Sequence, residues 1–361
     1  MDKRQDIPFA PGELSTLLIA WYERHGRELP WRQTRNPYRI WLSEIMLQQT
    51  TVAAVIPYYE RFLARFPDVA ALAAADPESV LELWSGLGYY SRARNLHKAA
   101  QQITNDLGGR FPETVEKLQS LPGIGRSTAG AIVSIAYDRP APILDGNIRR
   151  VLTRLMALAE PPRENEAEKK LWLWAQALTP VDRPHDYAQA IMDLGATICL
   201  PRQPRCPECP LAALCQARRD GIENDVPRQA HRKTAPVRRQ VILLLQRGGE
   251  LLVARRPEAG LLGGMWEFPC REIATEEKSE QVAAQRLLEL GCPTVPGLLG
   301  PIRHVYSHFR LQGDVYRVSL SPETKIAEGE MFWHDAEKLT DSPLHGAHQK
   351  ALQLLMKEDA R

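Results

Sequence analysis

The sequence has little net charge and no long apolar run. Basic residues number 46 and acidic residues 44, so a nucleic-acid site has to be a local patch and not a uniformly basic surface. No stretch reaches the roughly 18 consecutive apolar residues of a membrane span, and no N-terminal apolar core precedes a cleavage site. We therefore expect neither secretion nor membrane insertion, and predict a monomer in the cytoplasm.

Cysteine is also scarce, which excludes a disulfide scaffold. Four of the six cysteines fall within residues 199–215 with the spacing C-x6-C-x2-C-x5-C, namely Cys199, Cys206, Cys209 and Cys215. Thiolates this close fit a four-cysteine zinc site or a [4Fe–4S] cluster. Zinc ribbons usually carry two C-x2-C pairs and this set has one, so the spacing favours the cluster and leaves zinc open. Unrelated buried thiols are the third interpretation.

The chain is long enough, at 361 residues, for two or three domains. Residues 1–225 read as helices almost throughout, including the cysteine loop 199–215 at their end. Residues 226–240 hold two prolines and five basic residues without an acidic one, which predicts an interdomain linker, either a solvated tether or a phosphate contact. Residues 241–361 begin with two strand patterns and continue with helical patterns at 280–290 and 347–357 and a strand pattern at 313–320, which predicts an α+β domain.

The most informative stretch is 121–150, LPGIGRSTAGAIVSIAYDRPAPILDGNIRR. Gly123 and Gly125 predict a tight turn between two helices, and the start of the second helix offers unpaired N–H groups to one phosphate. Asp145, within Ile-Leu-Asp-Gly-Asn, predicts a carboxylate held at a helix entrance. A hairpin that only packs and an aspartate that only caps a helix are the alternatives.

Glu44 is the only charged residue between Ile40 and Tyr59, in an apolar and largely helical stretch. Burying an unpaired carboxylate is costly, so Glu44 either pairs with a neighbour or keeps its proton at a raised pKa. Raised carboxyl pKa values are typical of general acids, whereas a simple hydrogen bond to a neighbouring helix is the alternative.

The hairpin, the Gly/Pro-rich loop and the following aspartate together resemble the signature of the helix–hairpin–helix (HhH-GPD) DNA glycosylase superfamily. The cysteine spacing is similar to that of endonuclease III-like members, which implies a [4Fe–4S] cluster. With Trp41-Leu-Ser-Glu-Ile-Met-Leu-Gln-Gln-Thr50 and a Nudix-like order of elements after residue 241, the chain resembles the A/G-specific adenine DNA glycosylases of the MutY family. The implied fold is multidomain, with an all-α glycosylase domain, a four-cysteine iron–sulfur loop and an α+β Nudix-like C-terminal domain.

The resemblance implies a monofunctional enzyme that hydrolyses the N-glycosidic bond of adenine mispaired with 8-oxoguanine or guanine in double-stranded DNA. Glu44 would protonate adenine N7, Asp145 would stabilise the resulting sugar cation, and Asn147 would position the sugar or water. Endonuclease III relatives carry a catalytic lysine just after the hairpin, where this chain has Ser127.

Further contacts are implied by the same resemblance. Arg32 and Leu47 would line the base pocket, Gln49 and Tyr89 would surround the flipped base, and the hairpin would hold DNA through Gly123, Gly125 and Ser127. The lesion would be read by Tyr306, Ser307 and His308, whose alternative role is to cap a strand. An adenine contact at Gln189 stays open, because some relatives have glutamate there.

The Nudix-like part lacks the metal-binding pattern of that fold. When the signature frame ends on Gly291, Ala284 and Gln285 stand where Arg-Glu belong, and only Glu289 remains of the paired glutamates. Because magnesium needs clustered carboxylates, we expect the fold without the diphosphate chemistry.

Two other functions are compatible with the sequence. One is a related hairpin glycosylase with another target base. The other is a non-catalytic iron–sulfur DNA-binding protein, for which Glu44 and Asp145 would be dispensable.

Overall fold

The computed structural model describes residues 7–229, 235–257, 260–274, 276–306, 308–326, 331–340 and 342–359. The chain divides into two compact units, one of Met1–Leu83 with Arg92–Arg232 and the other of Trp84–Ser91 with Lys233–Arg361. Among the described residues, no helix combines the length and apolar character needed to cross a bilayer.

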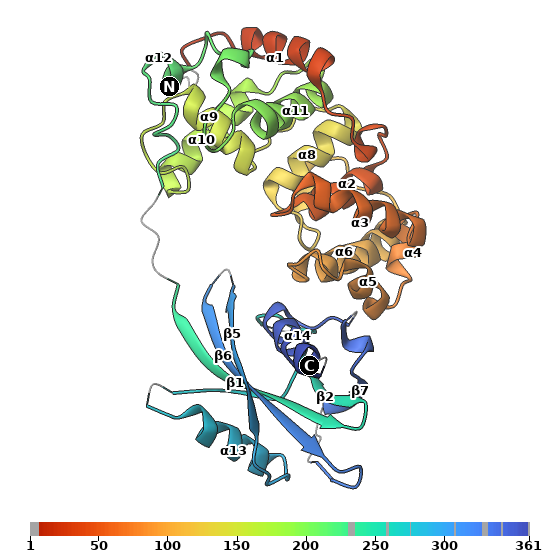
Figure 1. The fold of residues 1–361 in the computed structure, drawn as a ribbon. Helices are drawn as coiled ribbons and strands as arrows, with labels where there is room; N and C mark the ends of the chain where they lie inside the picture. The colour runs from red at the N-terminus through yellow and green to blue at the C-terminus, as the bar shows by residue number, and fades with distance from the viewer. Residues whose placement is uncertain are drawn as a thin grey trace. The chain divides into compact units, whose positions relative to one another are not determined.

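The first unit is helical, as the sequence predicts (Figure 1). Its α-helices are α1 (Pro11–His25), α2 (Pro37–Leu47), α3 (Val52–Arg65), α4 (Val69–Ala73), α5 (Pro77–Trp84), α6 (Ser91–Leu107), α7 (Val115–Gln119), α8 (Arg126–Tyr137), α9 (Gly146–Leu155), α10 (Asn165–Leu178), α11 (Pro184–Asp193) and α12 (Gln216–Arg219). Short 3-10 turns are η1 (Pro30–Arg32) and η3 (Cys206–Glu208), and η2 (Leu194–Ile198) is a π-helical turn.

The core of this unit explains the spacing of apolar residues in α9. Ile148, Val151, Leu152 and Leu155 are all buried and recur at helical intervals on one face. They join a cluster with residues of α1, α10 and α11. This packing holds the first turn of α9, where Asp145 and Asn147 lie, against the end of α11.

The second unit is a seven-stranded mixed sheet. Its strands are β1 (Val237–Arg247), β2 (Glu250–Arg255), β3 (Trp266–Glu267), β4 (Cys270–Glu272), β5 (Gly297–Val305), β6 (Arg310–Leu320) and β7 (Met331–Asp335). The order is β3-β2-β1-β6-β5, with β4 paired to β1 and β7 to β2. Strands β1 and β6 run parallel, from Val237 opposite Arg310 to Arg247 opposite Leu320, and the other pairs are antiparallel.

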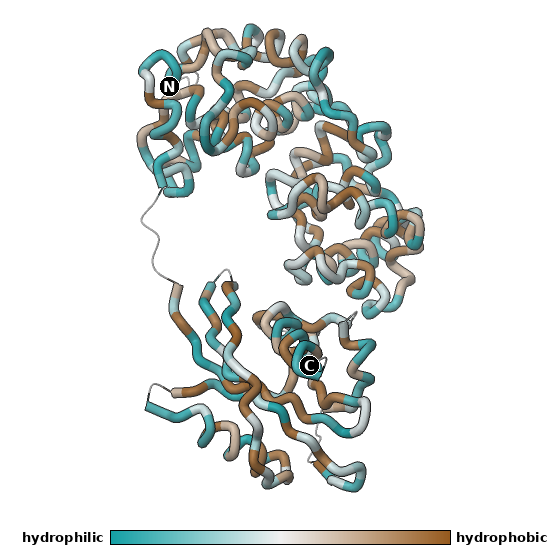
Figure 2. Tube along the Cα trace, in the orientation of Figure 1, coloured by the Kyte–Doolittle hydropathy of each residue, from teal (hydrophilic) through white to brown (hydrophobic). Residues whose placement is uncertain are grey.

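Helices cover both faces of this sheet, which explains the apolar run in β1. Ile242 and Leu244 point into a core shared with α14 (Gly346–Asp359), whereas Val241, Leu243 and Leu245 point into one shared with α13 (Ser279–Glu289). Alternating side chains of a strand face opposite sides, so a strand covered on both sides is apolar at every position. Figure 2 shows the hydrophobic stretches where the strands cross. The helices predicted at 280–290 and 347–357 and the strand at 313–320 are confirmed as α13, α14 and β6.

Candidate active site and cysteine site

The structure brings the three predicted catalytic residues to one cavity of about 410 Å³. Glu44 comes from α2, while Asp145 and Asn147 come from the start of α9, a hundred residues further along the chain. Arg32 and Leu47, expected in the base pocket, also line this cavity. Two carboxyl groups of distant origin therefore share one hollow with arginine, amide and apolar groups.

Glu44 lies half-buried on the cavity wall. Burial and, to a smaller extent, the nearby Asp145 raise its pKa, the Arg32 guanidinium lowers it, and the net result is a pKa of about 7. A carboxyl group that titrates near neutral pH holds a proton in a large fraction of molecules and releases it readily. This is the protonation behaviour of a general acid.

Asp145 caps helix α9. Its Oδ1 accepts a hydrogen bond from the backbone N–H of Ile148 at 2.7 Å. Burial raises the pKa of Asp145, and hydrogen bonds from the backbone N–H groups of Ile148 and Asn147 oppose that rise. The helix-cap interpretation of Asp145 is thus correct, and the cap also holds the carboxylate at the cavity.

Asn147 is fixed by a half-buried arginine and a closely approaching backbone segment. Its Oδ1 accepts a hydrogen bond from Arg150 Nη2 at 2.9 Å, and the same Nη2 donates to the carbonyl of Gly195 at 2.6 Å. A Cβ atom added to Gly195 would lie 2.7 Å from the Cβ of Asn147. Only glycine allows the π-helical turn η2 to approach the start of α9 this closely.

The remaining residues predicted to contact the base or DNA lie outside the cavity lining in the described part of the chain. Gln49 and Tyr89 are exposed and have φ angles of 60° and 50°. The hairpin forms as predicted, with Gly123 at φ +78° between α7 and α8. Ser127 accepts a hydrogen bond from the N–H of Leu144 at 3.1 Å, which ties the start of α8 to the segment that carries Asp145.

The hairpin geometry suits a phosphate at the start of α8. Its N-cap residue is Gly125, and no side chain caps this end of the helix. A Cβ atom on Gly123 would lie 2.8 Å from the Cβ of Asn95, so this position also requires glycine for close packing. The first N–H groups of α8 keep their donors for a ligand.

Several residues in or behind the cavity wall were not predicted, although the sequence pattern around one of them, Asp193, could have revealed it. Arg27, Arg150 and Gly195 line the cavity, and Asp193 lies behind it in contact with Arg27 and Arg32. Asp193 is the only charged residue between Tyr187 and Leu200, the same pattern that singles out Glu44. Gln189, for which the sequence left a contact open, is buried and lines the cavity.

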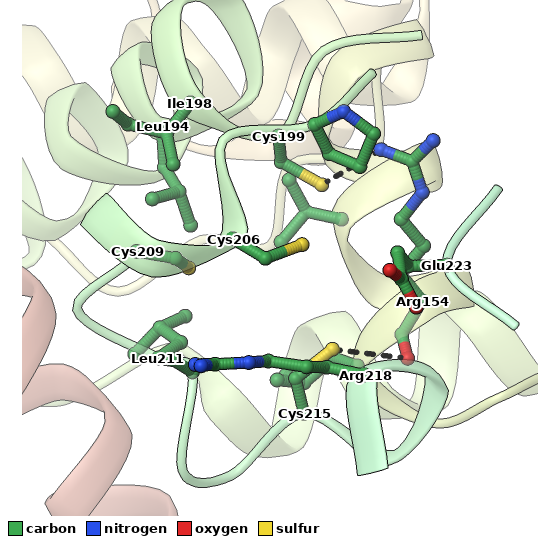
Figure 3. Close-up of a pocket in the computed structure, with 14 residues that line it drawn as sticks. Arg154, Leu194, Ile198, Cys199, Cys206, Cys209, Leu211, Cys215, Arg218 and Glu223 are labelled. Atoms are coloured by element: carbon green, nitrogen blue, oxygen red, sulfur yellow. Dashed lines mark hydrogen bonds between the residues drawn. The ribbon is translucent and has the colours of Figure 1, made fainter. Parts of the chain in front are cut away.

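The four predicted cysteines surround a second cavity (Figure 3). Among the described residues, no three of these sulfur atoms lie within 4.8 Å of one another. One group of three ligand atoms does meet that distance, and it lies in the second unit. A tetrahedral zinc ion with Zn–S bonds of about 2.3 Å needs sulfurs roughly 3.8 Å apart. A four-iron cluster is larger than a single ion, so the wider arrangement fits the cluster better than zinc.

Arg154, on the last turns of α9, binds the cysteine loop. Its guanidinium donates to Cys199 Sγ at 3.3 Å, to the Leu200 carbonyl at 2.6 Å and to the Val226 carbonyl at 3.0 Å. The side chain is buried, and Cys215 Sγ donates to the Arg154 carbonyl at 3.5 Å. Helix α9 therefore reaches the cavity of Glu44 and Asp145 at one end and the cysteine site at the other.

That group consists of Glu267, His345 and His348, and in the described residues it is the one whose three ligand atoms all lie within 4.8 Å of one another. The N–H of Phe268 donates to His348 Nδ1 at 2.7 Å, so the neutral ring carries its proton on Nε2. Tyr306 Oη accepts from the N–H of Ala347 and lies 2.8 Å from His345 Nδ1. Because His348 Nδ1 already accepts a backbone hydrogen bond, its Nε2 keeps the ring proton and is not a free ligand for a metal ion.

The predicted lesion-reading residues divide between interior and surface. Tyr306 packs against the core beneath α14 and makes the bonds just described, whereas His308 is exposed. Ser307 lies outside the described residues.

The Glu289 carboxylate forms ion pairs with two arginines. Arg271 and Arg286 donate to its two oxygens at 2.6 and 2.9 Å, and the hydrogen bond from Arg286 lowers the pKa of Glu289. The one carboxylate left in the Nudix frame is thus paired with two protein cations.

Comparison with known proteins gives a family match for each half of the chain. The family model for the HhH-GPD superfamily base excision DNA repair protein matches residues 42–177, and that for the NUDIX domain matches residues 240–354.

Relatives that match most of the chain share the description adenine DNA glycosylase. "Adenine DNA glycosylase" of Mus musculus is 35% identical over 402 residues, covering 95% of this chain and 78% of that protein. "Adenine DNA glycosylase" of Buchnera aphidicola (subsp. Schizaphis graminum) is 33% identical over 343 residues, covering 94% and 98%. A solved thermostable thymine-DNA glycosylase is similar with a TM-score of 0.53 and 28% identity, over 58% of this chain and 97% of that one.

Proposed function

The chain belongs to the adenine DNA glycosylase family and removes adenine in base excision repair, and we propose that it does so by acid-assisted hydrolysis at mispairs with 8-oxoguanine or guanine. The observation that carries the mechanism is the cavity shared by Glu44, with a pKa of about 7, and Asp145. The other two functions compatible with the sequence are not supported by the relatives, which share the adenine-specific description.

The target adenine has to leave the duplex before it is cut. A base inside the helix is out of reach of side chains, so the nucleotide rotates into a pocket. The cavity lined by Arg32 and Leu47 is our candidate for that pocket. The hairpin at Gly123 and Gly125, together with Ser127, would hold the backbone, and Gln49 and Tyr89 would support the opened duplex.

Glu44 and Asp145 divide the chemistry. Glu44 gives its proton to adenine N7, so the base departs as a neutral leaving group and the bond from N9 to the sugar breaks. The sugar gains oxocarbenium character, as in glycoside cleavage, and the Asp145 carboxylate stabilises it. Asn147, held by Arg150, positions the sugar or the attacking water. Water adds at C1′ and gives its proton to the now ionised Glu44, which leaves free adenine and an abasic site and restores the acid.

The strand stays intact in this mechanism. A glycosylase that also cuts the strand needs an amine to form a Schiff base, and Ser127 offers a hydroxyl that accepts a bond from Leu144. The enzyme is therefore expected to be monofunctional.

A [4Fe–4S] cluster held by Cys199, Cys206, Cys209 and Cys215 is the proposed cofactor. The sulfur spacing supports it over zinc. When bound, such a cluster supplies four iron–thiolate bonds that cross-link the loop. Arg154 ties that loop to α9 and donates to one of the sulfurs.

The C-terminal unit is proposed to choose the mispair. Adenine is a normal base, so its pocket cannot report that removal is appropriate. 8-Oxoguanine differs from guanine by an oxygen at C8 and a proton on N7, both on an edge that a polar side chain can read. The exposed His308 is the candidate reader, with Tyr306 as its internal anchor and Ser307 between them.

We divide the chain into a glycosylase domain at 1–225, a basic linker at 226–240 and a lesion-recognition domain at 241–361. We propose that the protein acts as a monomer. Because the proposed substrate is DNA, we propose that the protein acts at the nucleoid, in the cytoplasm.

A single-turnover assay tests this function. The full-length protein is mixed in excess with duplexes that carry adenine opposite 8-oxoguanine, guanine, cytosine or thymine. We expect adenine release opposite 8-oxoguanine and guanine, and strand breakage only after alkali or heat. Release from all four duplexes at one rate would contradict the mispair specificity, and borohydride trapping of a protein–DNA adduct would contradict simple hydrolysis.

A further inference from the structure

Asp193 is a fully buried acid behind the wall of the adenine cavity. It ends helix α11 and immediately precedes the π-helical turn η2, two residues of which, Gly195 and Ala196, line the cavity. Asp193 is not itself part of the lining, so it does not meet the substrate. A buried carboxylate next to a reaction site requires compensation by cations, and here the cations are cavity residues.

Two arginines saturate this carboxylate. Arg32 donates from Nη1 to Oδ2 and from Nη2 to Oδ1, both at 2.6 Å. Arg27 donates from Nε to Oδ1 at 2.7 Å and from its backbone N–H to Oδ2 at 2.9 Å. Each oxygen thus accepts two hydrogen bonds, and the planar guanidinium of Arg32 is held by a bidentate pair.

We propose that Asp193 is a positioning residue of the adenine site, which holds the Arg32 guanidinium in one orientation on the cavity wall and offsets its charge. This inference rests on the proposed function of the cavity. Arg32 also donates to the Arg27 carbonyl at 3.1 Å, so the arginines and the aspartate form one unit. Asp193 is thus the anion that both guanidinium groups contact, and its removal takes away the hydrogen bonds that orient them.

The charge offset gives Asp193 a measurable effect on Glu44. The charged groups that line the cavity are Arg27, Arg32, Glu44, Asp145 and Arg150, and the Tyr22 ring lies beside Arg32. Arg32 already lowers the pKa of Glu44, against burial and Asp145. Removing the negative charge of Asp193 leaves Arg32 uncompensated, so the pKa of Glu44 falls and the protonated acid becomes scarcer at neutral pH.

The test compares Asp193→Asn with Asp186→Asn in the full-length protein. Asp186 is on the same helix and pairs with Arg183 at the surface, so its variant is a matched loss of one charge outside the site. Single-turnover rates of adenine release, opposite 8-oxoguanine and opposite guanine, are followed from pH 5.5 to 9. Circular dichroism and thermal unfolding confirm that each variant is folded.

For Asp193→Asn we expect a rate about 10- to 100-fold lower at pH 7.5, since small displacements in an active site have effects of that size. The upper midpoint of the pH profile falls by about half to one pH unit, at the low end of the effect of a nearby charge. Asp186→Asn leaves both unchanged. An unmoved midpoint with a uniform loss of rate would overturn the proposal, because a purely structural role predicts that result.

A second pair of variants decides the question if Asp193→Asn does not fold. The Arg32→Gln variant is compared with the double variant Arg32→Gln/Asp193→Asn. In the double variant both members of the Arg32–Asp193 pair are neutral, so neither is left as an unpaired buried charge. If Asp193 acts through Arg32, the second substitution leaves the midpoint of the first unchanged. A further shift would overturn the proposal. Failure of the proposed function is separate, because the wild-type protein would then release no adenine from any duplex.

Discussion

At the scale of single residues, Glu44 and Asp145 show how one cavity treats two carboxyl groups differently. Among the residues that the structure describes, Glu44 has no hydrogen-bond donor comparable to the helix start that holds Asp145, so burial dominates and its pKa reaches about 7. Asp145 receives backbone N–H groups that oppose the effect of burial on its pKa. The positions of both acids were predictable, because Glu44 is the only charged residue of an apolar stretch and Asp145 stands between an apolar pair and a glycine at a helix entrance. The network of Asp193, Arg27 and Arg32 was not, since it joins residues more than 160 positions apart.

The raised pKa of Glu44 predicts a stability cost above neutral pH. The unfolded chain releases this proton near pH 4.5, but the folded chain holds it to about pH 7. The contribution to stability is therefore complete below pH 4.5 and is lost as the pH rises through 7. Glu44→Gln stays neutral, so we expect it to be more stable than wild type by about 1–3 kcal/mol at pH 8 and nearly equal at pH 5. Urea unfolding at both pH values measures this, with the exposed Glu60→Gln as control. A gain of the same size at both pH values would contradict the pKa shift.

Asp145 has a substitution that separates its two roles. Asparagine caps helices as well as aspartate does, so Asp145→Asn should keep α9 and the thermal midpoint. The carboxylate charge is lost, and we expect adenine release to slow by about 10²-fold or more, the effect of removing one transition-state electrostatic contact. Thermal unfolding and single-turnover release measure the two effects. A folded variant with near-normal release would show that Asp145 only caps the helix.

At the scale of helices and strands, features that depend on neighbouring residues were predicted, whereas contacts between distant segments were not. The glycines of the hairpin and the entrance of α9 are encoded within a few residues, and both were predicted. The π-helical turn η2 was not, because it depends on Gly195 meeting Asn147 from another helix. In the sheet, the parallel pairing of β1 with β6 joins segments about seventy residues apart, so their individual patterns could not reveal it.

The cysteine loop is the element whose integrity depends on a bound group. We expect purified protein to contain about four iron and four sulfide ions per chain, measured by elemental and acid-labile sulfide analysis. Cys206→Ser should lower the iron content, unfold the loop and weaken DNA binding before it affects the chemical step. Cys270→Ser, in β4 outside the site, is the control. Stoichiometric zinc without sulfide in anaerobically purified protein would contradict the cluster.

At the scale of the whole molecule, the two units are proposed to read the two strands of one mispair. The Nudix-like fold was predicted from its order of elements and is confirmed. The absence of magnesium chemistry, expected from the eroded frame around Glu289, stays a prediction. The inward position of Tyr306 was not predicted, because its partner His345 lies 39 residues further on.

His308 carries the prediction at this scale. One good base-edge contact contributes ~1–3 kcal/mol, so His308→Ala should reduce the preference for 8-oxoguanine over guanine by roughly 5- to 150-fold. Adenine release from bound substrate should change little, since the side chain is outside the cavity lining. Competition binding and single-turnover kinetics on the two duplexes measure this. Equal losses on both would assign the loop to stability alone.

The central claim is that Glu44 is the acid that releases adenine, and Glu44→Gln tests it most directly. Glutamine keeps the shape and hydrogen bonding of the protonated acid but has no proton to transfer. In single-turnover assays at pH 7 we expect mispair binding close to wild type and adenine release at least 10²–10⁴-fold slower, the usual contribution of a general acid. Glu60→Gln should behave as wild type in both measurements. Adenine release by Glu44→Gln at a near-wild-type rate would contradict the account.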